Sequence, residues 1–198
     1  MYEFVILAHL MRGPMHGYLI AKIINDMNGP YIRVSNGTIY PAFAKLEQQG
    51  LVAVDTSLPA TQLGDREPRV YRITEAGRQR FYDLMLDTSP NQKAYQETFL
   101  QKTGFFAFIT LQERLRLIDH YIHYCQSHIL YEQSEIDDLL KHVKANEQTV
   151  WKREDMVEAM QHILERWQLE LAWAQRLRER CQERELTRQE TEIPHKEP

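Results

Sequence analysis

Apolar residues recur at helical spacing in three consecutive segments at the start of the chain. Residues 1–11 and 17–27 each carry one apolar stripe, and a glycine-proline pair ends the pattern after each segment. A third helix is predicted between Ser35, whose hydroxyl suits the N-cap, and Gly50, which suits the left-handed position after a helix. Three short helices with tight connections are typical of a helix-turn-helix arrangement.

The third predicted helix is amphipathic. Its apolar stripe of Ile39, Phe43 and Leu46 requires a core to pack on. The opposite face carries hydroxyls, an amide, a phenol and a cation, which are groups that bind phosphate oxygens and base edges in a major groove. A merely solvated polar face is the alternative interpretation. The candidate DNA contacts on this face and on the preceding helix are Lys22, Ser35, Asn36, Thr38, Tyr40 and Lys45.

Two segments with strand character follow, at residues 51–58 and 69–74. The connection between them, residues 59–68, is too long for a two-residue hairpin turn. A hairpin directly after a recognition helix is typical of the wing of a winged helix. Arg66 and Arg69 lie near its tip and are further candidate DNA contacts, with plain solubility as the alternative role.

A change in composition marks the expected domain boundary. Thr74 and Glu75 are predicted to cap a fourth helix over residues 76–86, and a polar linker over residues 87–91 follows. We therefore predict a winged helix-turn-helix head over residues 1–88, a helical domain over 92–184 and a frayed polar tail over 185–198. The predicted fold class is mostly α with a small β-wing, in which an antiparallel, coiled-coil-like helical body follows the head.

Two long amphipathic helices are predicted in the second half of the chain. From Leu111 to Lys144 the apolar positions step by four and three residues, and a further helix begins near Val150. Glu132 interrupts one of the two apolar rows, so one helix packing against its own neighbour is an alternative to a zipper. So much uncovered apolar surface predicts a partner, most simply a second copy of the chain. The predicted dimer contacts are Leu115, Ile122, Ile129, Ile136, Trp167 and Trp173.

Charge is distributed unevenly along the chain of 198 residues, whose net charge is −4. Residues 1–80 hold 9 basic and 7 acidic residues, and the remaining 118 hold 15 and 21. A mildly basic head on an acidic body fits a DNA-binding module with a separate helical part. Cys125 and Cys181 form no disulfide pattern, and the apolar run over residues 4–11 is too short to span a bilayer, so a cytoplasmic protein without membrane contact is expected.

Metal and cofactor chemistry has little support in the sequence. His120, His123 and His128 lie close to Cys125, but their spacing matches no established metal site. A glycine-rich phosphate loop, a nucleophile elbow and recognisable paired carboxylates are all missing. We therefore expect no metal, no cofactor and no enzyme activity. Several aromatic residues form either ordinary core or the lining of an effector cavity: Phe99, Phe105, Phe106, Phe108, Trp151, Trp167 and Trp173.

Several spaced blocks of the first 86 residues together resemble the PadR-type winged-helix transcriptional regulators. These blocks are Gly13–Tyr18, Gly37–Ala42, Lys45–Glu47, Gly50–Val52 and Val70–Gly77. The resemblance implies a cytoplasmic, homodimeric prokaryotic repressor. It also implies a palindromic double-stranded operator and a response to a small, often aromatic or amphipathic, effector. The helical second half resembles the dimerising domain of the longer members of this family.

Two functional hypotheses follow from the sequence. The first is a dimeric, sequence-specific DNA-binding regulator, a repressor that a small phenolic or other aromatic effector releases from DNA. The second is a protein–protein adaptor, in which the winged helix is a scaffold without DNA binding.

Overall fold

The computed structural model describes residues 2–27, 29, 34–56, 69–89, 94–142 and 150–192. These residues form two compact units, Met1–Phe105 and Phe106–Pro198. Each unit is built from elements that are close in sequence, so each is described by itself.

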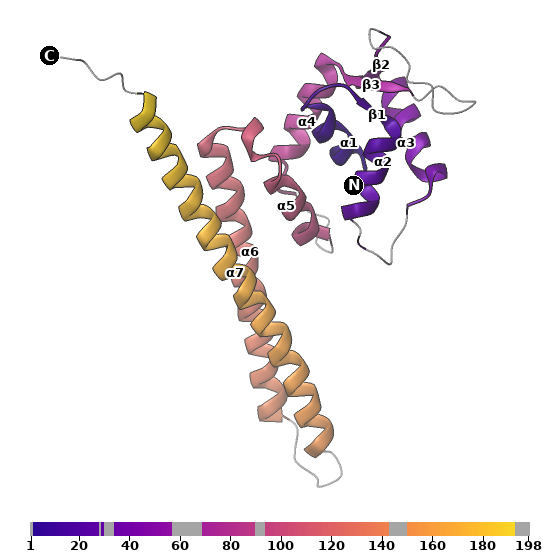
Figure 1. The fold of residues 1–198 in the computed structure, drawn as a ribbon. Helices are drawn as coiled ribbons and strands as arrows, with labels where there is room; N and C mark the ends of the chain where they lie inside the picture. Colours follow the sequence, from indigo (N-terminus) through magenta and orange to yellow (C-terminus); the bar gives the residue numbers. More distant parts are fainter. Residues whose placement is uncertain are drawn as a thin grey trace, which may run out of the picture. The chain divides into compact units, whose positions relative to one another are not determined.

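The first unit is a winged helix with a small sheet (Figure 1). Its elements in chain order are α1 (Tyr2–Leu10), β1 (Met15–His16), α2 (Gly17–Met27), α3 (Asn36–Gln48), β2 (Val52–Val54), β3 (Val70–Ile73), α4 (Glu75–Leu86) and α5 (Tyr95–Thr103). The three strands form one antiparallel sheet in the order β1-β3-β2. The predicted fold class, with three helices, a two-stranded wing and a fourth helix, is confirmed; strand β1 and helix α5 were not predicted.

Helix α1 is the centre of this unit, and every side chain from Phe4 to Leu10 on it is buried. A helix that is apolar all round is typical of a core position, so the single stripe expected from the sequence understates its burial. Helices α2, α3 and α4 all pack on it. The predicted stripe of α3 is confirmed as part of this core, because Ile39 and Phe43 are fully buried and Leu46 is 3% exposed.

Helix α5 extends the first unit to Phe105, beyond the boundary expected near residue 88. The ring of Phe105 lies edge-on to those of Phe4 and His9, at centroid distances of 6.0 and 5.2 Å. The Arg12 guanidinium lies 4.8 Å above the same ring and donates to Gly104 O at 3.2 Å. Linker composition signalled a boundary near residue 88, but these long-range contacts attach the next helix to the head.

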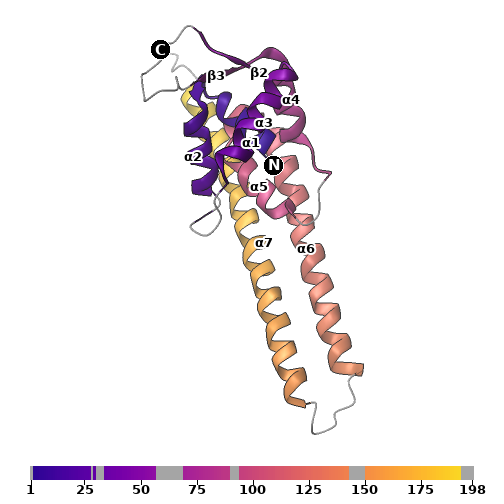
Figure 2. The same cartoon turned by 90° about the vertical axis from the view of Figure 1, so that its right-hand side faces the viewer.

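The second unit contains the short 3₁₀ helix η2 (Phe106–Phe108) and two long helices, α6 (Leu111–His142) and α7 (Val150–Glu192). The long helices lie side by side and antiparallel (Figures 1 and 2). Helix α7 continues to Glu192, whereas the sequence predicted a frayed tail after Arg184. Among the described residues, no helix has the length and apolar character needed to cross a membrane.

Candidate nucleic-acid interface

Helix α3 presents its polar face at the surface of the first unit. Ser35 occupies the N-cap position with extended backbone angles (φ −71°, ψ 154°), as predicted, but its side chain makes no capping hydrogen bond. Instead, Ser35 Oγ lies 3.3 Å from Thr38 Oγ1, and both residues are exposed. Tyr40 is 43% exposed, and Lys45, five residues further along the helix, is exposed as well. Four of the predicted contacts are therefore exposed, away from the buried stripe of α3; the side chain of Asn36 lies outside the described residues.

The C-terminal end of α3 is fixed by a Schellman motif. Gly50 has a φ of +71°, its N–H donates to Glu47 O at 2.9 Å, and Leu51 N donates to Leu46 O at 2.9 Å. The glycine predicted to end this helix therefore takes the left-handed conformation that the sequence analysis expected. The motif turns the chain directly into β2, so the helix and the wing have a fixed connection.

Helix α4 holds this turn from the other side. Thr74 is the N-cap of α4 and accepts from Gly77 N at 3.0 Å, while its hydroxyl lies 2.6 Å from Gly50 O. A Cβ added to Gly77 would lie 2.0 Å from Leu51 O, so only glycine allows this close approach. The segment Thr74–Gly77, part of the Val70–Gly77 block, thus joins the end of α3 to α4.

The base of the wing is formed by β2 and β3, with Val52 opposite Ile73 and Val54 opposite Tyr71. Tyr71 is buried, and its ring stacks on that of Phe43 with a centroid distance of 4.4 Å. Burial raises the pKa of the Tyr71 phenol, and its contact with Arg69 partly offsets this rise. Arg69 is exposed beside the sheet. The other predicted wing contact, Arg66, lies outside the described residues.

The predicted contact Lys22 is exposed on α2. The strand that precedes this helix was not predicted from the sequence. Strand β1 pairs with β3, and Gly17 N donates to Arg69 O at 3.2 Å, so the start of α2 is attached to the base of the wing. Two residues of strand have no period to detect, and their pairing partner lies more than fifty residues away along the chain.

The predicted dimer contacts on α6 differ in exposure within a single chain. Leu115, Ile122 and Ile129 are partly exposed, whereas Ile136 is 8% exposed. The fully buried residues on α6 include Ile118, Tyr121 and Cys125, which belong to other rows. This arrangement leaves most of the predicted seam accessible.

Both predicted tryptophans take part in packing within the helical unit. Trp167 stacks on His128 with a centroid distance of 4.1 Å and an interplanar angle of 7°, and Trp173 lies edge-on to Tyr121 at 6.2 Å. Tyr121 donates its hydroxyl to Glu170 Oε2 at 2.9 Å. Burial is the largest cause that raises the pKa of Tyr121, and burial also raises that of Cys125 to about 12. The described residues contain no cluster of His, Cys, Asp and Glu suited to a metal ion.

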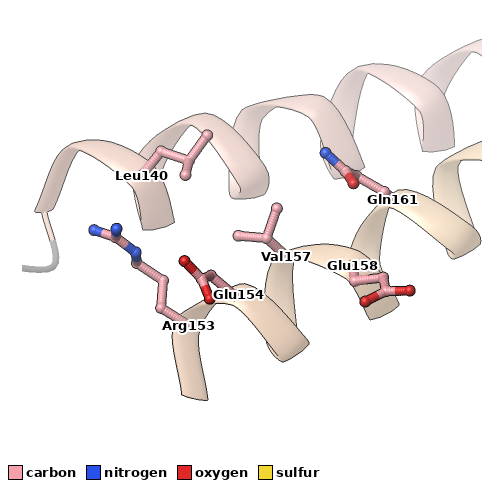
Figure 3. A pocket seen from close by; sticks show the side chains of 6 residues that line it. All are labelled: Leu140, Arg153, Glu154, Val157, Glu158 and Gln161. Atoms are coloured by element: carbon pink, nitrogen blue, oxygen red, sulfur yellow. The ribbon is translucent and has the colours of Figure 1, made fainter. Parts of the chain in front are cut away.

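A hollow of about 530 Å³ lies between the C-terminal end of α6 and the N-terminal end of α7 (Figure 3). Leu140 and Val157 supply its apolar lining, and Arg153, Glu154, Glu158 and Gln161 surround them. Its lining mixes both signs of charge, so it shows no preference for an anionic or a cationic ligand.

The comparison with known proteins identifies the first unit. Residues 6–83 match the family described as the transcriptional regulator PadR-like family. Over these residues the chain is similar to this family. The matched segment contains α1 to α4 and the sheet, so it covers the whole candidate interface. Because this is a family of regulators, the prediction that the chain is not an enzyme is confirmed.

The chain is also similar to the negative transcriptional regulator PadR of Bacillus subtilis (strain 168). It is 26% identical over 111 residues, which are 56% of this chain and 59% of the relative. Two solved structures are similar at low identity. Bacillus subtilis PadR in complex with operator DNA is 21% identical and covers 90% of this chain and 98% of that one, with a TM-score of 0.39. The PadR-like regulator BC1756 from Bacillus cereus is 18% identical and covers 93% and 99%, with a TM-score of 0.36.

Proposed function

We propose that this PadR-like protein binds double-stranded DNA by placing α3 in a major groove. The observation that carries the proposal is the division of α3 into two faces. Ile39, Phe43 and Leu46 anchor the helix in the core, while Ser35, Thr38, Tyr40 and Lys45 stand open on the other side. An anchored helix with exposed donors is what major-groove reading requires. We expect the exposed Arg69 and the predicted contact Arg66 to bind the DNA backbone beside the groove.

The proposal includes a homodimer formed by the helical unit. Large apolar side chains remain exposed on α6 and α7, among them Leu130 at 68% and Leu169 at 67%. Together with the partly exposed seam, they provide surface for a second copy. A dimer would present two α3 helices to an operator with two-fold symmetry and half-sites about 34 Å apart.

We further propose that the protein acts in the cytoplasm as a repressor which a small aromatic effector releases from DNA. The repressor role follows the Bacillus subtilis relative, which is named a negative regulator. Release requires that the effector bind the DNA-incompetent arrangement more tightly than the competent one.

A mobility-shift titration with DNA upstream of the protein's own gene tests the proposal. Lys45→Ala should weaken binding and make the dependence of log Kd on log salt shallower by about one unit, because a lysine bound to phosphate releases counterions. The matched control is Lys141→Ala, which removes an exposed lysine that is 4.0 Å from Asp137 on α6 and should change neither quantity. If the wild-type protein binds neither this DNA nor an unrelated duplex at low salt, the scaffold role without DNA binding is correct instead.

A further inference from the structure

The junction between β1 and α2 lies where three parts of the proposed DNA surface meet. The backbone at Gly17 is bonded to the base of the wing at Arg69. A Cβ built on Gly17 would lie 3.1 Å from the Tyr71 ring and 3.6 Å from the Tyr40 ring. Gly17 therefore lets the exposed tyrosine of α3 pack directly against the start of α2. Residues next to Gly17 thus share a surface with the recognition helix.

The side chain beside this glycine is an exposed aromatic one. Tyr18 is 42% exposed, and among the described residues its hydroxyl has no hydrogen-bond partner. Its ring packs on the imidazole of His16 with a centroid distance of 5.3 Å and an interplanar angle of 32°. This contact limits the side-chain conformations that are open to Tyr18. The result is a phenol held at the surface with its donor unused.

Tyr18 also shares a helical face with Lys22. Residues four apart on a helix are neighbours on one face, and both of these side chains are exposed. A phenol and an ammonium in line are two donors that suit oxygens spaced along a phosphate backbone. A single hydroxyl cannot make the paired bonds that distinguish one base pair from another.

We propose that Tyr18 binds a backbone phosphate of the DNA at the junction between the recognition helix and the wing. The proposal rests on the proposed function, because it needs α3 in the groove. It adds a contact from β1–α2 that fixes how deeply α3 enters. Since phosphate contacts position a protein without reading sequence, Tyr18 contributes equally to operator and non-operator DNA.

The test compares Tyr18→Phe with the wild-type full-length chain on two duplexes. One duplex comes from upstream of the protein's own gene, and the other is a scrambled duplex of equal composition. Removing the hydroxyl should raise Kd about fivefold on both, which is the usual effect of losing one hydrogen bond. The salt slope should not change, because the lost group is neutral; Lys22→Ala, in contrast, should make it shallower by about one unit.

Tyr131→Phe is the matched control, since Tyr131 is 59% exposed on α6 and should leave Kd unchanged. The ring stays in both variants, so thermal unfolding should match that of the wild type. If wild-type protein binds DNA and Tyr18→Phe binds it equally well, the Tyr18 contact is refuted while DNA binding stands. A loss on the upstream duplex alone would assign Tyr18 to a base and overturn the phosphate assignment. If wild-type protein binds neither duplex, both this inference and the proposed function fail.

Discussion

Gly37 stands in the first turn of α3, between the exposed hydroxyls of Ser35 and Thr38. Its φ is not in the left-handed region, and a Cβ added to it would meet only Ser35 Oγ, at an ordinary 3.5 Å. Gly50 and Gly77, in contrast, are required by a positive φ and by a close backbone approach. A glycine in a helix is less stable than alanine by roughly 1 kcal/mol. No contact among the described residues requires a glycine at position 37, so we expect its small size to serve a molecule that approaches α3 from outside.

Replacing Gly37 by alanine should therefore separate folding from binding. We expect Gly37→Ala to raise the free energy of unfolding by up to about 1 kcal/mol. The same change should weaken DNA binding, because the added methyl stands where α3 approaches the groove. Urea unfolding and a mobility-shift titration measure the two effects.

Gly104→Ala is the control for this experiment. A Cβ at Gly104 would likewise meet a single oxygen at 3.5 Å, the backbone oxygen of Gln101, but Gly104 lies at the end of α5. This variant should keep wild-type DNA affinity. Unchanged DNA affinity in Gly37→Ala would show that DNA does not closely approach the first turn of α3.

At the scale of elements, α5 is held to the end of α4 by Lys102. Its Nζ donates to Asp87 O at 2.5 Å, and the residue is only 4% exposed. Burial lowers the pKa of this ammonium from 10.5 to about 8, against a smaller opposing effect of the Asp87 carboxylate. Relative to the unfolded chain, the folded chain therefore prefers the neutral amine.

This preference predicts a dependence of stability on pH. Below pH 8 both states hold the proton, and the fold carries the full penalty of burying a charge. Between pH 8 and 10.5 the folded state has lost the proton that the unfolded state keeps, so stability rises with pH. The total gain is about 3 kcal/mol. The measurement is the unfolding free energy of wild type and of Lys102→Met at several pH values. The wild-type value minus the variant value should rise between pH 8 and 10.5.

Because the other titrating groups are the same in both proteins, their contributions cancel in this difference. Burial raises the pKa of Cys125 to about 12, which lowers stability above pH 9, but equally in both proteins. A difference that stays constant from pH 7 to 10.5 would mean that Lys102 titrates at its ordinary value.

The elements that the sequence predicted are those with local signals. Helix α3 has a stripe, an N-cap residue and a closing glycine within sixteen residues, and all three keep their positions. Strand β1 and helix α5 depend on partners far along the chain, the first on Val70 and Tyr71 and the second on the α4 end. Lysine side chains are rarely fully buried in proteins. The sequence therefore could not predict that Lys102 is buried where α5 contacts the end of α4.

The candidate site divides in the same way. The exposed side of α3 could be predicted, because the helical spacing of its apolar residues shows which side is buried and therefore which side is exposed. Tyr18 was missed because its exposure depends on how α2 meets the sheet. The tryptophans of α7 were assigned to a dimer from size alone, whereas each also contacts an aromatic residue of α6.

At the scale of the whole molecule, the two compact units predict what truncation will do. We expect a fragment of residues 1–105 to fold and to sediment as a monomer, while the full chain sediments as a dimer. The isolated head should then bind DNA weakly, since it carries one α3 rather than two. Sedimentation of both proteins at equal concentration is the measurement.

A shorter fragment ending at residue 90 is the informative comparison. It lacks Phe105 and Lys102, so the His9 ring loses its contact with the Phe105 ring and the Asp87 carbonyl loses its hydrogen-bond donor. It should unfold at lower urea than the 1–105 fragment. A tight dimer of either fragment would show that the long helices serve another partner.

The two-faced packing of α3 bears on how such regulators diversify. Among the described residues, Ser35, Thr38, Tyr40 and Lys45 use their side chains for no hydrogen bond to the rest of the first unit beyond the Ser35–Thr38 pair. Exchanging them would leave the anchoring stripe, the Schellman turn and the Thr74 cap unchanged. With α3 reading the operator as we propose, a gene duplicate can acquire a new operator by changing a few surface codons, without loss of folding at each intermediate step.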